Sequence, residues 1–305
     1  MIKRFLDPTN DFAFKQIFGQ EKNKDILIHF LNDVLSHKDM GTIEEVEFLD
    51  PLQRPDITVS KVSIVDIHCR DDKGQRYIIE MQVARQDYFI KRAQYYAAKT
   101  YCSQMTRGGT YEGLKQVIFL AITDFEVLPK KRNYKTTHGI FDIETQEHDL
   151  KDFHFVFLQL PKFKKGLEGL ETMEEKWCYF LKHADETKGR DYEQLVENAP
   201  IMKRAYDELD ASNWTEEELS AYEKGEKDRR DEAAILKTAR REGKDEGLTE
   251  GMEKGMEKGM EKGAAEKNLE NAKSMLEEGI SPDTVTRITG LSKDELNKLH
   301  PKPPA

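Results

Sequence analysis

Residues Gln116–Ile122 (QVIFLAI) form a continuous apolar run that is as long as a single strand. A run of this kind is typical of a strand with both faces buried, so it indicates the centre of a sheet. Earlier in the chain, apolar residues recur at steps of three and four through Phe14–Leu35, which predicts helices with one buried face. Residues 1–165 are therefore expected to form an α/β domain, to which Asn133–Ile143 and Phe153–Leu160 contribute further strands.

A β-hairpin is predicted upstream of the central strand. Val59–Arg70 is rich in β-branched residues, Asp71–Gly74 has the composition of a turn, and Gln75–Ala84 returns as the second strand. Apolar residues occupy the odd positions of both strands, and we expect them to face the core. The polar residues at even positions, which are expected to share the other face, are Asp66, His68, Glu80 and Gln82.

The length of the turn decides which residues of the hairpin face each other. With a three-residue loop and Gly74 in the left-handed conformation, Asp66 lies directly across from Glu80, and Ile64 across from Gln82. A four-residue loop would place the two acids on opposite faces. We favour the three-residue loop because it also gathers all the apolar residues on one face.

Two carboxylates in this register have Cβ atoms about 5 Å apart, and they repel each other unless a proton or a cation lies between them. Mg²⁺ (or Mn²⁺) suits such a pair, because it takes hard oxygen ligands and keeps several waters. The metal would lower the pKa of a bound water and neutralise charge at a scissile phosphate. Asp66 and Glu80 are the expected metal ligands, and Gln82 is expected to orient the water or the phosphate. The alternative is a pair of ordinary polar residues on a solvated sheet face.

Basic side chains follow the hairpin closely. The helix expected over Gln86–Met105 carries Lys91, Arg92 and Lys99, and Arg85 precedes it. Arg85, Arg92 and Lys99 are the expected contacts to DNA phosphates. A charged helix face in contact with water is the alternative.

A helical region follows the α/β domain. Residues 166–240 have the pattern of a helical extension, and in residues 241–263 a glycine recurs every four positions, from Gly243 to Gly263. Each interior glycine costs roughly 1 kcal/mol of helix stability relative to alanine, so the repeat alone is a marginal helix. Either its glycines allow another helix to approach closely, or it is a frayed linker.

Residues 264–305 form a small predicted helical unit whose outline resembles a helix-turn-helix. Pro282 is placed to begin one helix, and Gly290 to end it. The segment has six Lys and Arg residues against seven Asp and Glu residues, whereas a DNA-reading module usually has a basic face. We therefore favour a packing or oligomerisation unit, and we expect the helical C-terminal region to mediate homo-oligomerisation.

The formal net charge of the 305 residues is −10, which excludes a globally basic nucleic-acid binder but allows a local basic patch. Three cysteines lie far apart, at Cys69, Cys102 and Cys178, so neither a disulfide framework nor a zinc cluster is supported. The sequence has no apolar run long enough to span a membrane and no GxxxxGK[ST] motif. We expect a cytoplasmic protein with no membrane partner and no nucleotide cofactor.

Four segments resemble the Rpn (recombination-promoting nuclease) family, also described as PD-(D/E)xK nuclease family transposases. They are NDFAFKQIFG (10–19), VDIHCRDDKGQRYIIEMQ (65–82), RAQYYAAKTY (92–101) and GGTYEGLKQVIFLAI (108–122). The resemblance covers residues 5–165. It implies a restriction-endonuclease-like αβββαβ core, with a mixed sheet flanked by helices, ahead of the long helical C-terminal region. It also implies Mg²⁺-dependent cleavage of DNA.

Carried over from the family, Asp66 is the first metal carboxylate and Glu80 the second, while Gln82 stands where the wider superfamily has lysine. A neutral amide cannot stabilise negative charge as lysine does, so Lys91 or Lys99 is a candidate source of the missing charge.

The superfamily often has a further acid on its first helix, for which Asp11 is the candidate here. An acid that only stabilises the first turn of that helix is an equal alternative. Asp56, in a literal Pro-Asp dipeptide, lies outside the tight hairpin, and we prefer Asp66 as the metal ligand.

The expected organisation is a nuclease domain over 1–165, a helical extension over 166–240, a glycine-periodic helix or linker over 241–263 and a helical unit over 264–305. The expected function is DNA endonuclease activity of the recombination-promoting or transposase-related kind. In this reaction, water hydrolyses the phosphodiester without a covalent intermediate. Two alternatives remain: a degenerate nuclease that binds DNA or protein without cutting, and a scaffold in which the long charged helix is the functional part.

Overall fold

The computed structural model describes residues 3–35, 41–53, 63–105 and 108–299. The chain divides into two compact units, Met1–Arg230 and Asp231–Ala305. Among the described residues, no helix combines the length and the apolarity that crossing a membrane requires.

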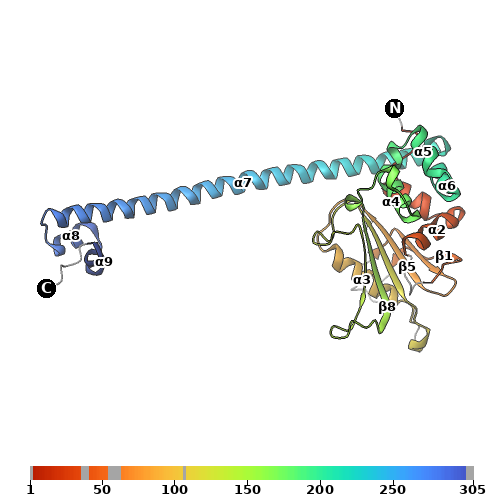
Figure 1. Cartoon of the computed structure of the whole chain (residues 1–305), viewed down its shortest axis with the longest axis horizontal. Helices are drawn as coiled ribbons and strands as arrows, with labels where there is room; N and C mark the ends of the chain where they lie inside the picture. Colours follow the sequence, from red (N-terminus) through yellow and green to blue (C-terminus); the bar gives the residue numbers. More distant parts are fainter. Residues whose placement is uncertain (1–2, 36–40, 54–62, 106–107, 300–305) are drawn as a thin grey trace. The chain divides into compact units, whose positions relative to one another are not determined.

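The first unit is an α/β structure in which helices precede, interrupt and follow the strands (Figure 1). Its N-terminal helices and first strands are α1 (Asp11–Phe18), α2 (Lys24–Val34), β1 (Val46–Phe48), β2 (Leu52–Gln53), β3 (Ser63–Ile64), β4 (Ile67–Asp71) and β5 (Arg76–Gln82). They are followed by α3 (Phe89–Cys102), β6 (Val117–Thr123), β7 (Lys135–Ile140), β8 (Leu150–Gln159), α4 (Met173–His183), α5 (Gly189–Val196) and α6 (Pro200–Leu209).

The described strands form a six-stranded mixed sheet in the order β1-β4-β5-β6-β8-β7. Strands β5, β6 and β8 are parallel, and the other neighbours pair antiparallel. Every residue of β6 is buried, as expected for the apolar run at the centre of the sheet. The succession of α1 and α2, then β1, β4 and β5, then α3 and β6 confirms the predicted αβββαβ core.

Helices cover both faces of the sheet (Figure 1). On one face, α3 packs through Ala93 and Ala97 against Ile78 and Phe119 of the strands. On the other face, α1 and α2 share one apolar core with α4 and α6. Residues 173–209 therefore complete the core of the first unit. The predicted domain boundary at residue 165 does not coincide with a break in this core, and it stays a prediction.

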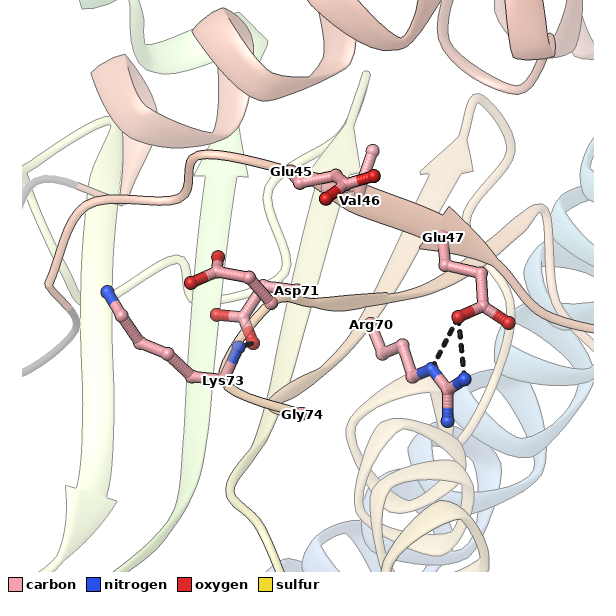
Figure 2. A pocket seen from close by; sticks show the side chains of 8 residues that line it. Glu45, Val46, Glu47, Arg70, Asp71, Lys73 and Gly74 are labelled. Carbon is pink, nitrogen blue, oxygen red and sulfur yellow. Dashed lines mark hydrogen bonds and ion pairs between the residues drawn. The ribbon is translucent and has the colours of Figure 1, made fainter.

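The β4–β5 hairpin has the predicted three-residue loop. Asp71 pairs with Gln75 through a main-chain bond of 3.1 Å, and Gly74 has φ +83°. The Asp71 carboxylate fixes this turn, because it accepts hydrogen bonds from the Lys73 and Gln75 main-chain N–H groups and from the Tyr77 hydroxyl. Figure 2 shows the turn, together with the side-chain ion pair that Arg70 makes to Glu47 on β1.

One part of the predicted hairpin is wrong. Ile64 was expected across from Gln82, but it pairs with Leu52 of β2 and is largely exposed. Strand β4 begins only at Ile67, so Asp66 and Val65 lie before it, and Val65 packs into the core on the α3 side of the sheet. Because Asp66 lies outside β4, its side chain does not follow the alternation of the strand, and its Oδ2 accepts the Met81 main-chain N–H.

A single helix, α7 (Glu216–Glu277), begins in the first unit and continues into the second. Its first turns are fixed by Tyr222, whose hydroxyl accepts the Asp7 N–H at 3.0 Å, and by Arg229, which lies 3.0 Å from the Asp7 carboxylate. The glycine repeat lies inside α7, and a Cβ added at any of its glycines would meet no other described atom within 4 Å. The repeat is therefore helical and exposed in the single chain.

The second unit ends in three helical segments around a small core. The end of α7, α8 (Pro282–Thr289) and α9 (Lys293–Leu299) bury Ala272, Val285 and Leu296 between them. Gly279 and Gly290 separate the helices with φ +84° and +74°, which only glycine adopts readily.

Candidate active site

The site is centred on two acidic residues from neighbouring strands. The pairing of β4 with β5 ends at Ile67 and Ile79, and Asp66 and Glu80 are the next residues beyond that pair. The two residues are bonded reciprocally: Asp66 Oδ2 accepts the Met81 N–H at 2.8 Å, and the Asp66 main-chain N–H donates to the Glu80 carboxylate. These bonds hold the two carboxylates side by side at the end of the hairpin.

Burial and mutual repulsion disfavour charge on both acids. Burial raises the pKa of Glu80 to about 8, and the neighbouring Asp66 carboxylate adds to that shift. Burial also raises the pKa of Asp66 to about 6, against the opposing effect of Lys15. Glu80 is only 3% exposed, and its Oε1 atom has no hydrogen-bond partner among the described residues. A buried carboxylate oxygen without a partner is costly, so this atom is suited to an added proton or cation.

Helix α1 brings a third acid, Asp11, and a cation, Lys15, to the pair. Lys15 Nζ lies 3.4 Å from Asp66 Oδ1 and 2.7 Å from Asp11 Oδ1. Asn10 caps this helix by accepting the N–H groups of Phe12 and Ala13, which fixes where the first turn begins. The structure thus brings Asp11 close to Asp66, with Lys15 bound to both.

Gln82 connects the acids to helix α3. Its Nε2 donates to Glu80 Oε2 at 2.9 Å, and its Oε1 accepts from Arg92 Nη2 at 2.9 Å. Arg92 also donates to the Gln86 side chain. The positive charge of Arg92 opposes the rise in the pKa of Glu80. Gln82 therefore has its amide oriented from both ends, although it carries no charge itself.

The other predicted residues lie farther along the same flank. Arg85 and Lys91 are exposed near the start of α3, where Lys91 Nζ lies 5.7 Å from the centre of the Tyr88 ring. Lys99 lies seven residues after Arg92 on α3 and is half-buried. The catalytic and DNA-binding roles of Lys91 and Lys99 stay predictions. Asp56 lies outside the described residues.

Sequence reasoning missed Lys15 as a member of this site. Its spacing of four residues from Asp11 on a predicted helix was the available signal, because such pairs meet on one helix face. Only the packing of α1 against the hairpin shows that the same ammonium group reaches Asp66.

The donor set fits a divalent metal, although no group of three or more His, Cys, Asp or Glu side chains converges among the described residues. Asp66 and Glu80 offer hard oxygen ligands, which Mg²⁺ and Mn²⁺ prefer. The pKa values of both carboxyl groups are raised, and a bound cation would lower them again. Glu80 Oε1 is also a buried oxygen without a hydrogen-bond partner among the described residues. These two residues would hold the metal.

A hollow of about 410 Å³ lies at the hairpin turn (Figure 2), and neither Asp66 nor Glu80 lines it. It is lined by Glu45, Glu47, Arg70, Asp71 and Lys73. The Asp71 carboxylate is used by the turn, and Glu47 is bound to Arg70. These residues therefore stabilise the hairpin.

Residues 265–301 match the family model described as "Rpn/YhgA-like nuclease family, C-terminal HTH domain". This match supports the helix-turn-helix outline seen in the sequence, and α8, Gly290 and α9 lie within the matched residues. A role of this unit in packing or self-association stays a prediction. The balance of six basic against seven acidic residues does not report this geometry, because a helix-turn-helix is defined by how short helices pack around a turn.

Residues 8–239 match the family model described as "PD-(D/E)XK nuclease family transposase". No curated protein and no solved structure matches the chain significantly. The family match covers the described α/β unit from before α1 into α7, and the αβββαβ order of elements agrees with it. The chain therefore belongs to the PD-(D/E)XK nuclease family transposases.

Proposed function

We propose that the protein is an endonuclease that hydrolyses DNA phosphodiester bonds with Mg²⁺ or Mn²⁺, in a recombination-promoting or transposase-related role. The observation that carries the proposal is the pairing of Asp66 with Glu80, both with raised pKa values, one of them with a buried oxygen that lacks a partner. Structural acids are usually satisfied by hydrogen bonds or ion pairs, whereas perturbed acids of this kind are typical of functional sites.

Each residue of the site has a defined task in this proposal. A bound divalent ion supplies an activated water and charge neutralisation at the phosphate. Asp66 and Glu80 hold the ion, and Gln82, oriented by Arg92, hydrogen-bonds the water or a phosphate oxygen. Lys15 supplies the positive charge that Gln82 lacks, and Asp11 positions Lys15 through their 2.7 Å ion pair.

DNA is the proposed substrate, held by the basic flank of Arg85, Arg92 and Lys99, with Lys91 on the same flank. The C-terminal helix-turn-helix is a second proposed DNA contact, within a protein of the cytoplasm. The exposed glycine repeat of α7 is proposed to be the surface for self-association, because its glycines would let a second copy of the helix approach closely.

A nicking assay tests the proposal directly. The wild-type protein with Mg²⁺ or Mn²⁺ is expected to convert supercoiled plasmid to nicked and linear forms, and chelation should stop it. Asp66→Asn and Glu80→Gln keep the size of each side chain and one acceptor oxygen but remove its charge, and each is expected to reduce cleavage at least 10²-fold. Glu47→Gln, at the exposed ion pair with Arg70, is the matched control and should cut like wild type. Equal cleavage by all four proteins would reject the site.

One observation favours the degenerate nuclease as a second candidate. Lys15 Nζ, at 3.4 Å from Asp66 Oδ1, already supplies a cation next to the acids, and Gln82 replaces the lysine expected in the superfamily. A protein that binds DNA without cutting would show a shift of labelled DNA in a gel under conditions where no nicking occurs with either metal. Cleavage that depends on Glu80 would exclude this candidate.

A further inference from the structure

A second cavity lies at the start of α3, on the flank of the carboxylate pair. It has a volume of about 430 Å³ and is lined on its apolar side by Tyr88, Phe125 and Val127. Arg85, Lys91 and Gln86 provide its polar lining. The volume is within the range of about 300–1,000 Å³ that is typical of small-molecule sites. The site chemistry described above does not use this cavity.

A chain of hydrogen bonds joins the cavity to the acids. Gln86 lines the cavity and accepts a hydrogen bond from Arg92, and Arg92 donates to Gln82, which in turn donates to Glu80. A ligand in the cavity would therefore be linked to the acids through Gln86, Arg92 and Gln82. A nucleic acid with a phosphate at Glu80 has neighbouring bases that could extend along this flank.

Tyr88 offers its ring to a ligand rather than to the core. The residue is 77% exposed, and its ring lies under the Lys91 ammonium at 5.7 Å. Its φ of +62° is in the left-handed region, which a bulky residue adopts only rarely. Strained backbone conformations of this type cluster at functional sites. A glycine at this position would have no strain, so the presence of tyrosine indicates that its side chain is needed. The strain and the exposure together indicate a ring that is held in place for contact.

We propose that this cavity binds an unpaired nucleobase adjacent to the scissile phosphate, so that the enzyme selects DNA with a displaced or single-stranded nucleotide. The base stacks on Tyr88 and contacts Phe125 and Val127, the Gln86 amide meets its polar edge, and Arg85 and Lys91 bind the flanking phosphates. The inference rests on the proposed nuclease function and names the class of DNA that this site prefers.

Binding to two matched oligonucleotides tests the inference. The full-length Glu80→Gln protein, which is expected to bind without cutting, is titrated with a fluorescent duplex that carries a single-stranded flap. In one probe the first flap nucleotide has its base, and in the other it is abasic, so that only the base differs. The base-containing probe is expected to bind roughly 5- to 150-fold more tightly, as stacking on one aromatic ring predicts. Equal affinity for the two probes, or no binding to either, would overturn the inference.

Two substitutions of Tyr88 separate loss of the ring from loss of folding. Tyr88→Gly, added to Glu80→Gln, removes the ring and also relieves the positive φ, so the fold should be at least as stable while the preference for the base disappears. Tyr88→Phe keeps the ring and should keep the preference. Tyr111→Ala is the matched control, because Tyr111 is 81% exposed and lies outside the cavity. A preference that survives Tyr88→Gly contradicts the assignment.

The two proposals fail in different ways. Cleavage of plain duplex plasmid by the wild-type protein, dependent on Glu80, reports on the nuclease function alone. If that cleavage occurs and the base and abasic probes bind equally, only the nucleobase site is wrong. If no cleavage occurs but the base is preferred through Tyr88, the cavity binds nucleic acid in a protein that does not cut.

Discussion

Asp66 and Glu80 lie just beyond the Ile67–Ile79 pair that ends the β4–β5 hairpin, and Asp66 Oδ2 accepts the main-chain N–H of Met81, the residue after Glu80. The turn at Gly74 sets this relationship, because a loop one residue longer would move the two acids to opposite faces. The chemistry of the site therefore depends on the conformation of a turn that is eight residues away from Asp66 and six from Glu80.

Substitution of Gly74 tests the importance of the turn. Gly74→Ala is expected to lower the free energy of unfolding by about 1 kcal/mol, because alanine is strained at positive φ. The added Cβ would also lie 3.3 Å from Lys115 Cγ. Gly113→Ala is the control, because that glycine has no positive φ and an added Cβ there meets nothing within 4 Å. Urea denaturation of both variants measures the difference, and equal stabilities would contradict the account of the turn.

Lys15 is expected to act in catalysis. Lys15→Ala should reduce cleavage about 10²-fold with little change in folding, because the site loses the cation nearest Asp66. Lys15→Arg should retain part of the activity. Lys22→Ala removes a lysine of similar type whose partner, Glu208, lies elsewhere, and it should have no effect. If Lys15→Ala increases cleavage, the lysine competes with the metal instead of assisting it.

The raised pKa values of the two acids predict how stability depends on pH without metal. Between the ordinary carboxyl pKa of about 4 and the folded-state values of about 6 for Asp66 and about 8 for Glu80, the folded state binds more protons than the unfolded state. The contribution of the pair to the free energy of unfolding therefore falls as pH rises through this window. Glu80→Gln removes one titrating group and should stabilise the metal-free protein by roughly 1–3 kcal/mol near pH 8. If the free energy of unfolding depends on pH in the same way in both proteins, the two acids do not form a buried, mutually repelling pair.

Metal binding should reverse the loss of stability that the two buried acids cause at high pH. Mg²⁺ or Mn²⁺ at 10 to 100 times its dissociation constant is expected to raise the free energy of unfolding by about 1.4–2.7 kcal/mol. The increase should be larger at pH 8 than at pH 5, because protons compete for the same oxygens. Thermal denaturation with and without metal measures it, and Glu80→Gln should abolish it. A shift of equal size in Glu80→Gln would place the metal elsewhere.

The glycine repeat of α7 gives a test of self-association. Replacing Gly251, Gly255 and Gly259 by alanine should raise helix stability by up to about 1 kcal/mol per site, because an added Cβ meets no other described atom. The same triple variant should sediment as a smaller species if these glycines contact a second copy. Glu261→Ala, at a non-glycine position of the helix, should change neither property much. An unchanged oligomer would remove the glycines from the proposed interface.

Local sequence patterns determined the order of the elements in this protein. Residues 117–122 of the apolar run are buried along β6, the acids lie beside one hairpin and its turn, and Pro282 and Gly290 mark the ends of α8. These features follow from periodicity, turn geometry and capping, which act over a few residues. The partnership of Asp66 with Glu80 belongs to the same class, because one turn sets it.

Tertiary structure decided which groups from distant segments surround the two acids. Packing of α1 against the hairpin brings Lys15 to Asp66, and packing of α3 brings Arg92 to Gln82. The break in the strand at Asp66, which sends Ile64 to pair with Leu52, also escaped the alternation pattern. The physical reason is common to all three: each depends on how separate elements fit together in space, and a linear pattern reports only the face that each element buries.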